Sequence, residues 1–216
     1  MQRQLVSTTH SKGITQVELL VGMAVTLVLV AALAQMMVGV KSASSRMGQL
    51  SEAEQMAQID MEFLVGILLR SGYRHDRHSA LNDIFPATSG FTAGSVVRGT
   101  DHTLQLRYQS AGDASSRSCD GRATRAGGLV TEVLALDGGK LSCRSDAGEP
   151  GIWRTHVLGT EAEELQFSYG VDQDGDGAVD AYLPAQRVEN WGQVLSVRVA
   201  LNKTYSTVVA LRNRLK

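Results

Sequence analysis

The N-terminal region contains an uncharged apolar run that constrains the whole chain. The run extends from Leu19 to Val40, and its only strongly polar residues are Thr26 and Gln35. About 20 consecutive apolar residues can span a bilayer as a helix, so this run is long enough to do so. A chain of 216 residues then has room for one further domain with a modest core.

A single carboxylate, Glu18, stands at the N-terminal edge of this run. A carboxylate at a membrane edge needs water or a cationic partner, and such a residue points to function by default. The nearest downstream cation is Lys41, which lies about 35 Å further along an α-helix. Glu18 therefore predicts a partner that its own helix does not supply.

The leader before the run is basic and allows more than one interpretation. It carries Arg3 and Lys12 and no acid, which favours a cytoplasmic N-terminus. A cleaved secretory signal is one interpretation, because Ala32-Leu33-Ala34 has the A-x-A pattern. Against it, the apolar stretch continues past that site to Val40. An ordinary membrane anchor is another, but it leaves Glu18 without a partner.

The segment Lys12-Gly13-Ile14-Thr15-Gln16-Val17-Glu18-Leu19 resembles the prepilin N-terminal methylation motif of the type IV pilin-like superfamily. In that family a prepilin peptidase cleaves after the glycine, and the new N-terminal residue is methylated. The resemblance implies cleavage between Gly13 and Ile14. It also implies that Glu18 pairs with the α-amino group of Ile14 on a neighbouring subunit, which would favour assembly because buried opposite charges offset each other when paired.

This chain departs from the usual prepilin pattern at two positions. Ile14 stands where Phe or Met is commoner, and Gln16 stands where Leu is usual. Neither departure removes a group that the cleavage or the charge pairing needs.

The helical pattern continues beyond the apolar run. Apolar residues recur three, four or seven positions apart and form one stripe: Met47, Leu50, Ala57, Met61, Leu64 and Leu68. Gly72 follows the last periodic residues and suits the end of a helix. We expect one helix from about Ile14 to Ser71, whose second half packs its stripe on a sheet. A coiled coil is the alternative, but the stripe breaks at Glu54.

The remaining chain alternates in the way that half-buried strands do. The clearest runs are Leu165 to Val171 and Leu195 to Leu201, and Asp137-Gly138-Gly139 is a hairpin signal. We expect an α+β, pilin-like fold with a mostly antiparallel β-sheet head. The predicted parts are a leader (1–13), the membrane or filament-core half of the helix (14–41), its amphipathic half (42–72) and the head (73–216).

Softer features narrow the resemblance to PilW-type minor pilins. They are the end of the long helix around Arg70-Ser71-Gly72-Tyr73, the two spaced cysteines, Tyr169-Gly170-Val171-Asp172 before an acidic loop, and Trp191 before a Val-Leu-Ser-Val-Arg-Val strand. The related J-type minor pseudopilin of type II secretion is the nearest competitor. The resemblance implies an inner-membrane protein with a cytoplasmic N-terminus and a periplasmic head, which joins the pilus at the cell surface.

The resemblance also implies partners. They are other minor pilins, the major pilin, the prepilin peptidase and the inner-membrane assembly platform, and a large tip adhesin is a further candidate. A net charge of −1 argues against nucleic acid as a partner, and the short basic end, Arg212-Asn213-Arg214-Leu215-Lys216, is typical of a solvated terminus.

The chain has two cysteines, Cys119 and Cys143. An even count on an exported chain predicts one disulfide, whereas unpaired thiols or a metal pair are the alternatives. A bridge between them would close a loop and lower the entropy of the unfolded chain. On this account the bridge would stabilise the fold by about 3–4 kcal/mol.

The acidic loop, Asp172 to Asp180, matches the first nine positions of an EF-hand-like calcium loop. Gly177 is the glycine that allows the sharp turn, but Leu183 replaces the usual bidentate acid at the twelfth position, so affinity should be low. The alternative is a plain turn between two strands. The predicted Ca²⁺ ligands are Asp172, Asp174, Asp176, the carbonyl of Ala178 and Asp180.

No enzyme signature is present in the sequence. It contains no G-x-S-x-G, H-E-x-x-H or phosphate-binding loop. We therefore expect a non-enzymatic minor pilin that acts in the structure and initiation of a type IV pilus. The alternatives are the J-type pseudopilin and, in another class, an exported calcium-binding or hydrolytic domain with a conventional signal or anchor.

Overall fold

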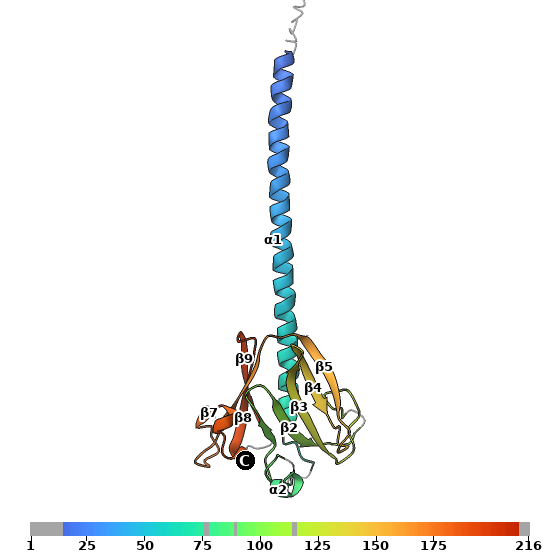
Figure 1. The fold of residues 1–216 in the computed structure, drawn as a ribbon, viewed down its shortest axis with the longest axis vertical. Helices are drawn as coiled ribbons and strands as arrows, with labels where there is room; N and C mark the ends of the chain where they lie inside the picture. Colours follow the sequence, from blue (N-terminus) through green and yellow to red (C-terminus); the bar gives the residue numbers. More distant parts are fainter. Residues whose placement is uncertain (1–14, 76–77, 89, 114–115, 212–216) are drawn as a thin grey trace, which may run out of the picture. The chain divides into compact units, whose positions relative to one another are not determined.

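The computed structural model describes residues 15–75, 78–88, 90–113 and 116–211, apart from the side chains of 49–53 and 160. The chain divides into two compact units, Met1–Glu52 and Ala53–Lys216. The boundary falls inside the predicted amphipathic half of the helix rather than at its end. A long N-terminal helix followed by antiparallel sheets confirms the α+β, pilin-like fold class (Figure 1).

Helix α1 (Gln16–Arg70) is continuous, as the periodicity predicted. It ends where Gly72 adopts a φ of 71°, a left-handed conformation that glycine enters without a steric penalty. The Gly72 amide then donates to the carbonyl oxygen of Arg107 at 2.9 Å, which ties the end of the helix to a strand.

The part of α1 in the first unit is apolar and its side chains are exposed. Gln16–Gly48 is the one helix of the described chain that is long and apolar enough to cross a membrane. Met36 and Met37 are 72% and 78% exposed, which is far beyond what a water-soluble helix carries in a continuous run. This surface therefore requires lipid or other apolar helices as its surroundings.

The second unit contains two antiparallel sheets. The larger has the strand order β1-β2-β3-β4-β5, in which each strand pairs with its neighbour in sequence; Figure 1 labels β2 to β5. Its hairpin between β3 and β4 turns at Gly138 and Gly139, whose φ angles of 58° and 76° suit a type I′ turn, as the sequence predicted. The strands are β1 (Val97–Gly99), β2 (Leu104–Gln109), β3 (Leu129–Asp137), β4 (Lys140–Ser145) and β5 (Arg154–Glu161).

The smaller sheet has the strand order β7-β6-β8-β9. The predicted alternating runs form its two central strands, β6 and β8, which pair from Leu165↔Leu201 to Val171↔Val194. Its strands are β6 (Leu165–Val171), β7 (Ala181–Leu183), β8 (Val194–Leu201) and β9 (Tyr205–Ala210). The short helices of the unit are α2 (Leu81–Ile84), η1 (Ala185–Arg187) and η2 (Trp191–Gln193).

One hydrophobic core joins the last turns of α1 to both sheets. The α1 residues in it are Ala57, Leu64, Ile67 and Leu68. This confirms that the helix packs on a sheet and does not form a coiled coil in this part. Met47, which the predicted stripe also included, lies in the first unit and is exposed.

Asp60 also lies on the packed face of α1, although it is not one of the residues of the predicted apolar stripe. Its side chain is buried against Gly159 of β5. A Cβ at Gly159 would lie 2.4 Å from the Asp60 carboxylate oxygens. Strand β5 therefore approaches the helix this closely only because residue 159 has no side chain.

Candidate functional site

Glu18 forms a reciprocal cap with Thr15 at the start of α1. The backbone N–H and the hydroxyl of Thr15 each donate to Glu18 Oε2 at 3.1 Å. The Glu18 N–H in turn donates to Thr15 Oγ1 at 3.4 Å, which completes a capping box. The carboxylate also lies at the positive end of the helix dipole, so the helix itself stabilises its charge.

This cap was missed by the sequence reasoning, although the signal was present. Thr15-Gln16-Val17-Glu18 has the T-x-x-E spacing of a capping box ahead of an apolar run. Among the residues that the structure describes, no cation forms an ion pair with Glu18. Gly13 and Ile14, the predicted cleavage and methylation residues, lie outside the described residues, so the pairing of Glu18 with an Ile14 amine stays a prediction.

The polar residue Thr26 does not interrupt the apolar surface of α1. Its hydroxyl bonds back to the carbonyl oxygen of Gly22 and lies 3.2 Å from that of Met23. A Thr hydroxyl that bonds back to its own helix leaves no donor for the surroundings. Glu18 is the one charged residue of the described helix before Lys41.

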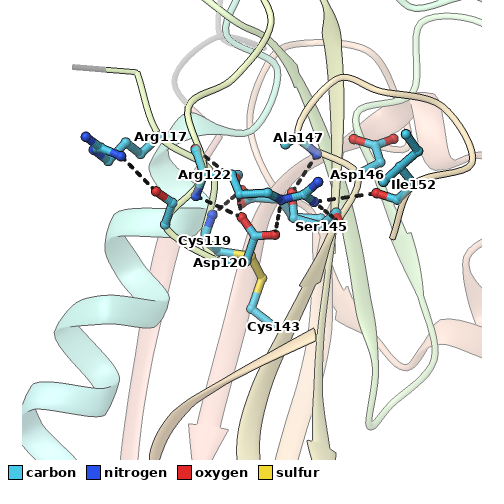
Figure 2. A network of polar contacts seen from close by, with 12 residues as sticks. Arg117, Cys119, Asp120, Arg122, Cys143, Ser145, Asp146, Ala147 and Ile152 are labelled. Atoms are coloured by element: carbon cyan, nitrogen blue, oxygen red, sulfur yellow. Dashed lines mark hydrogen bonds and ion pairs between the residues drawn. A yellow bond between two sulfur atoms is a disulfide. The ribbon is translucent and has the colours of Figure 1, made fainter. Parts of the chain in front are cut away.

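The predicted disulfide between Cys119 and Cys143 is present. Cys143 lies on the core side of β4, and Cys119 lies in the loop between β2 and β3, with Cα atoms 6.2 Å apart. Figure 2 shows the bridge beneath a polar network that includes Arg122 and Asp120. The bridge therefore anchors an irregular loop to the middle of the larger sheet.

Arg122 ties the same loop to a second segment. Its Nε lies 2.6 Å from Asp120 Oδ2, and its Nη2 donates to the carbonyl oxygen of Ser145 at 2.7 Å (Figure 2). Burial alone would raise the pKa of Asp120, but hydrogen bonds from Ser118 and Arg122 outweigh it and lower that pKa. The loop is thus held by a covalent bond and by a charge-assisted network.

A buried carboxylate, Glu132 of β3, lies next to the disulfide. Its Oε1 accepts hydrogen bonds from the Tyr108 hydroxyl at 3.0 Å and from the Cys119 N–H at 2.7 Å. Its Oε2 lies 3.8 Å from Nη2 of Arg70, the last residue of α1, and has no hydrogen-bond partner among the described residues. Burial raises the pKa of Glu132, and the Arg70 charge opposes that rise.

Arg70 connects this carboxylate to the disulfide loop. Its Nη1 donates to the carbonyl oxygen of Arg117 at 2.7 Å, and its guanidinium lies 5.5 Å from the centre of the Tyr108 ring. The end of α1 is therefore fastened to the larger sheet through charge as well as apolar packing. The sequence reasoning missed Glu132, although an acid between Val130 and Leu134 on a core-facing strand was a readable signal.

The acidic loop connects β6 to β7, as the sequence predicted. The carboxylate of Asp172 is buried, and it accepts the N–H groups of Gly175 at 2.7 Å and Gly177 at 3.0 Å. Asp174 and Asp176 each accept the N–H two residues further on, at 3.1 Å and 2.7 Å. These bonds shape the loop into consecutive turns.

Three of the predicted calcium ligands lie together. Single carboxylate oxygens of Asp172, Asp174 and Asp176 lie within 4.8 Å of one another, which fits the oxygen-rich donor set of a hard cation. Asp180 is not part of this group, and its Oδ2 accepts the N–H of Gln173 at 2.7 Å. Calcium binding stays a prediction, and Asp180 and the Ala178 carbonyl are its least supported ligands.

Comparison with known proteins found one family. The family model described as Type IV Pilus-assembly protein W matches residues 131–204. The matched part runs from β3 to the end of β8 and contains Cys143, the acidic loop and Trp191. Searches of curated proteins and of solved structures found no significant match.

The family match agrees with the independent features of the chain. It lies in the head, whereas the prepilin-like motif and the apolar helix lie at the other end of the sequence. A pilus-assembly family favours a structural role, and an apolar N-terminal helix fits membrane anchoring. Over residues 131–204 the chain is similar to the type IV pilus-assembly protein W family, and this match supports the PilW-type resemblance and an association with the type IV pilus.

Proposed function

We propose that this chain is a minor pilin, a structural and initiation subunit of a type IV pilus. The observation that carries the proposal is the match of the head, residues 131–204, to the pilus-assembly protein W family. The apolar helix with one carboxylate at its start also supports the proposal. In a filament, the apolar surface of this helix would pack on other subunits instead of lipid.

The physical basis of assembly is the surface of α1. Gln16–Gly48 buries none of its most apolar window within the chain. Packing such helices side by side removes them from lipid with little gain or loss of hydrophobic free energy. A charge pair between Glu18 and the amine of a neighbouring Ile14 would therefore be decisive, because it acts only in the assembled state.

The proposal includes maturation and topology. A prepilin peptidase would cleave between Gly13 and Ile14, with the N-terminus in the cytoplasm and the head in the periplasm. The inner-membrane assembly platform, the major pilin and other minor pilins would be its partners during extrusion, and a tip adhesin is a further candidate. After assembly the head would lie on the pilus at the cell surface.

Two Glu18 variants test this assembly role. Glu18→Leu and Glu18→Gln should insert into the membrane normally, because neither adds a charge to the apolar run. Both should be lost from sheared pili, because neither can pair with an amine. Immunoblots of membrane fractions and of purified pili measure the two steps separately.

Thr15→Ala is the matched control for these variants. It removes the hydroxyl that caps Glu18 within its own helix but keeps the carboxylate. Loss of such a cap costs about 1 kcal/mol of helix stability, which should not prevent assembly. If Thr15→Ala is lost from pili as completely as Glu18→Gln, capping and not pairing between subunits is the role of Glu18.

The J-type pseudopilin remains the alternative within the same class. The match to a pilus-assembly family favours the pilus. Deleting the gene should abolish or reduce surface pili and leave type II secretion intact. The reverse result would overturn the pilus assignment.

A further inference from the structure

The face of the larger sheet that points away from the core carries a row of side chains, all but one of them polar. In β2, β3 and β4 the alternate residues Leu106, Glu132 and Cys143 are buried, so their neighbours point outward. Strand pairing places one outward residue of each strand in register, and together they cross the whole sheet: Arg98, Gln105, Val133, Arg144 and Thr155.

Loops on either side convert this face into a groove. The groove has a volume of about 580 Å³, which is in the range of small-molecule sites. Its lining includes Thr88 and Phe91 from the segment before β1 and Pro150 and Trp153 from the segment before β5. A smaller hollow of about 270 Å³ shares Arg98 and Gln105 with it and extends toward Trp191.

The two arginines of the row are held in place by aromatic rings. The Arg98 guanidinium lies 5.4 Å from the centre of the Phe91 ring, and that of Arg144 lies 4.9 Å from the Trp153 ring. A Cβ at Gly90 would lie 1.2 Å from Arg98 Nη1, so the absence of a side chain there lets the guanidinium rest against the backbone. Stacking orients a guanidinium and leaves its N–H edge able to donate.

Neither arginine forms an ion pair with a carboxylate among the described residues. The one acid in the lining is Asp146, whose Oδ1 already accepts the N–H groups of Thr131 at 2.8 Å and Gly148 at 3.0 Å. Arg98 and Arg144 stand three strand spacings apart, or about 14 Å between backbones. The groove thus presents a separated pair of cations with neutral hydrogen-bonding and apolar groups between them.

We propose that this groove binds an acidic oligosaccharide, a class of ligand that goes beyond the pilus-assembly role. Carboxylates on separate sugar rings would pair with Arg98 and Arg144, since a guanidinium recognises a carboxylate bidentately. The side chains of Gln105 and Thr131 would bind ring hydroxyls. The partly buried Trp153 and the floor residue Val133 offer apolar surface to the C–H face of a sugar ring.

The chemistry of the groove disfavours the two other anionic polymers. A sheet face offers side chains and no free backbone groups, so an extended acidic peptide would gain none of the main-chain pairing that an edge strand provides. Nucleic acid binding depends on neutralising many phosphates. The lining has only two cations, Arg98 and Arg144, and it also contains the acid Asp146. A sparsely charged, hydroxyl-rich ligand fits both limits.

Calorimetric titration of the full-length chain in zwitterionic lipid nanodiscs tests this proposal. The probe is hexagalacturonate, and the matched control is the same hexamer with its carboxylates methyl-esterified. We expect saturable binding of the acid and at least tenfold weaker binding of the ester, since the ester cannot form the charge-assisted bonds. The double substitution Arg98→Gln with Arg144→Gln should weaken acid binding by about tenfold or more.

Arg187→Gln is the control substitution, because Arg187 is exposed in η1 and does not line the groove. It should bind hexagalacturonate like the unmodified chain. If the double variant does not fold, the exposed Arg144→Gln alone carries the test. The chain has two tryptophans, so in a Trp191→Phe background the fluorescence of Trp153 should change on binding and locate the ligand.

Three results would overturn the proposal. The first is equal affinity for the acid and its ester, and the second is unchanged affinity in the arginine variants. The third is tighter binding of an oligothymidylate or an oligoglutamate at the same site, measured as displacement of hexagalacturonate. All three leave the pilus-assembly role untouched, because that role is read from incorporation into pili.

Discussion

At the scale of single residues, Arg107 shows how one buried cation can organise a loop. It is 1% exposed, and each of its five N–H donors has an acceptor. Burial lowers its pKa to about 10, so it is charged at neutral pH. Its guanidinium also lies 4.5 Å from the centre of the Phe91 ring. The acceptors lie along the loop before β1: the carbonyl oxygens of Phe85, Pro86, Thr92 and Ser95 and the hydroxyl of Thr88.

We predict that Arg107→Lys destabilises the head by about 3 kcal/mol, because lysine keeps the charge but cannot reach five acceptors at once. Thermal unfolding followed by circular dichroism measures the change. Arg187→Lys, an exposed substitution of the same kind, is the control and should leave the melting temperature unaltered. Equal melting temperatures for Arg107→Lys and the control would show that the loop does not depend on this residue.

A second prediction concerns the pH dependence of stability at Glu132. Burial raises the pKa of this acid, so the folded chain keeps a proton at pH values where the unfolded chain has lost it. Its contribution to stability is therefore greatest below the unfolded pKa, about 4.3, and is lost as pH rises through the folded value. The glutamine in Glu132→Gln does not titrate, so the stability of this variant should not show this decrease as pH rises.

The measurement is the melting temperature of the unmodified chain minus that of Glu132→Gln, between about pH 4.5 and pH 8. We expect this difference to fall as pH rises. A difference that rises would mean that the ion pair with Arg70 outweighs burial and that the pKa of Glu132 is lowered.

At the scale of elements, the acidic loop and the strands around it are stabilised differently. The strands β6 and β7 pair only from Tyr169↔Leu183 to Val171↔Ala181. The loop between them is shaped mostly by bonds from its own side chains to its backbone, and Gln193 bonds to its first residues. Clustered carboxylates repel one another, and a divalent cation would remove that repulsion. If calcium binds as predicted, we expect it to stabilise this connection between β6 and β7 most directly.

We predict that Ca²⁺ raises the melting temperature of the head. Binding to the folded state stabilises it by about 2.7 kcal/mol at a hundredfold excess over Kd. Mg²⁺ should have much less effect, because it requires a tighter octahedral site. Asp174→Asn with Asp176→Asn removes two charges and keeps an acceptor at each turn, so it should abolish the response to Ca²⁺. Identical melting curves in millimolar Ca²⁺ and in chelator would reduce the loop to a turn.

At the scale of the whole molecule, the two units have opposite requirements for their surroundings. The first exposes a continuous apolar helix, whereas the second buries its apolar residues in a core shared by α1 and both sheets. The disulfide belongs to the second unit and is compatible with an oxidising compartment. The first half fits membrane anchoring, and the second is a folded domain outside the apolar surroundings of the first.

The intact mass of the mature protein tests the predicted leader cleavage, N-terminal methylation and disulfide formation in one experiment. We expect a chain that begins at Ile14, carries one methyl group and lacks the two hydrogens of the Cys119 and Cys143 thiols. Gly13→Arg should leave the full-length precursor, because a small residue is needed at the scissile bond. A mature chain that begins at Gln35 would instead establish a conventional secretory signal.

Local features of the sequence were sufficient for the elements whose cause is local. The length of the apolar run predicted the membrane-type helix, the alternation of Leu165 to Val171 predicted β6, and Gly138-Gly139 predicted the hairpin turn. The pairing of the two cysteines was also predictable, because only one pairing is possible. The T-x-x-E cap could have been predicted but was not.

Features that depend on register and packing were decided only by the tertiary structure. The division into two sheets, the contact between Glu132 and Arg70, and the five bonds of Arg107 each join residues far apart in the chain. The groove likewise exists because three strand pairings align Arg98 with Arg144. A strand pattern states which residues share a face but not which strand lies beside it, and a shift of one residue in pairing would turn these side chains to the other face. The sequence by itself thus predicted the apolar helix, the alternating strands β6 and β8, the β3–β4 hairpin and the one possible cysteine pair, because the cause of each is local. The tertiary structure decided which charges meet and where a ligand could bind, because register and packing join residues far apart in the chain.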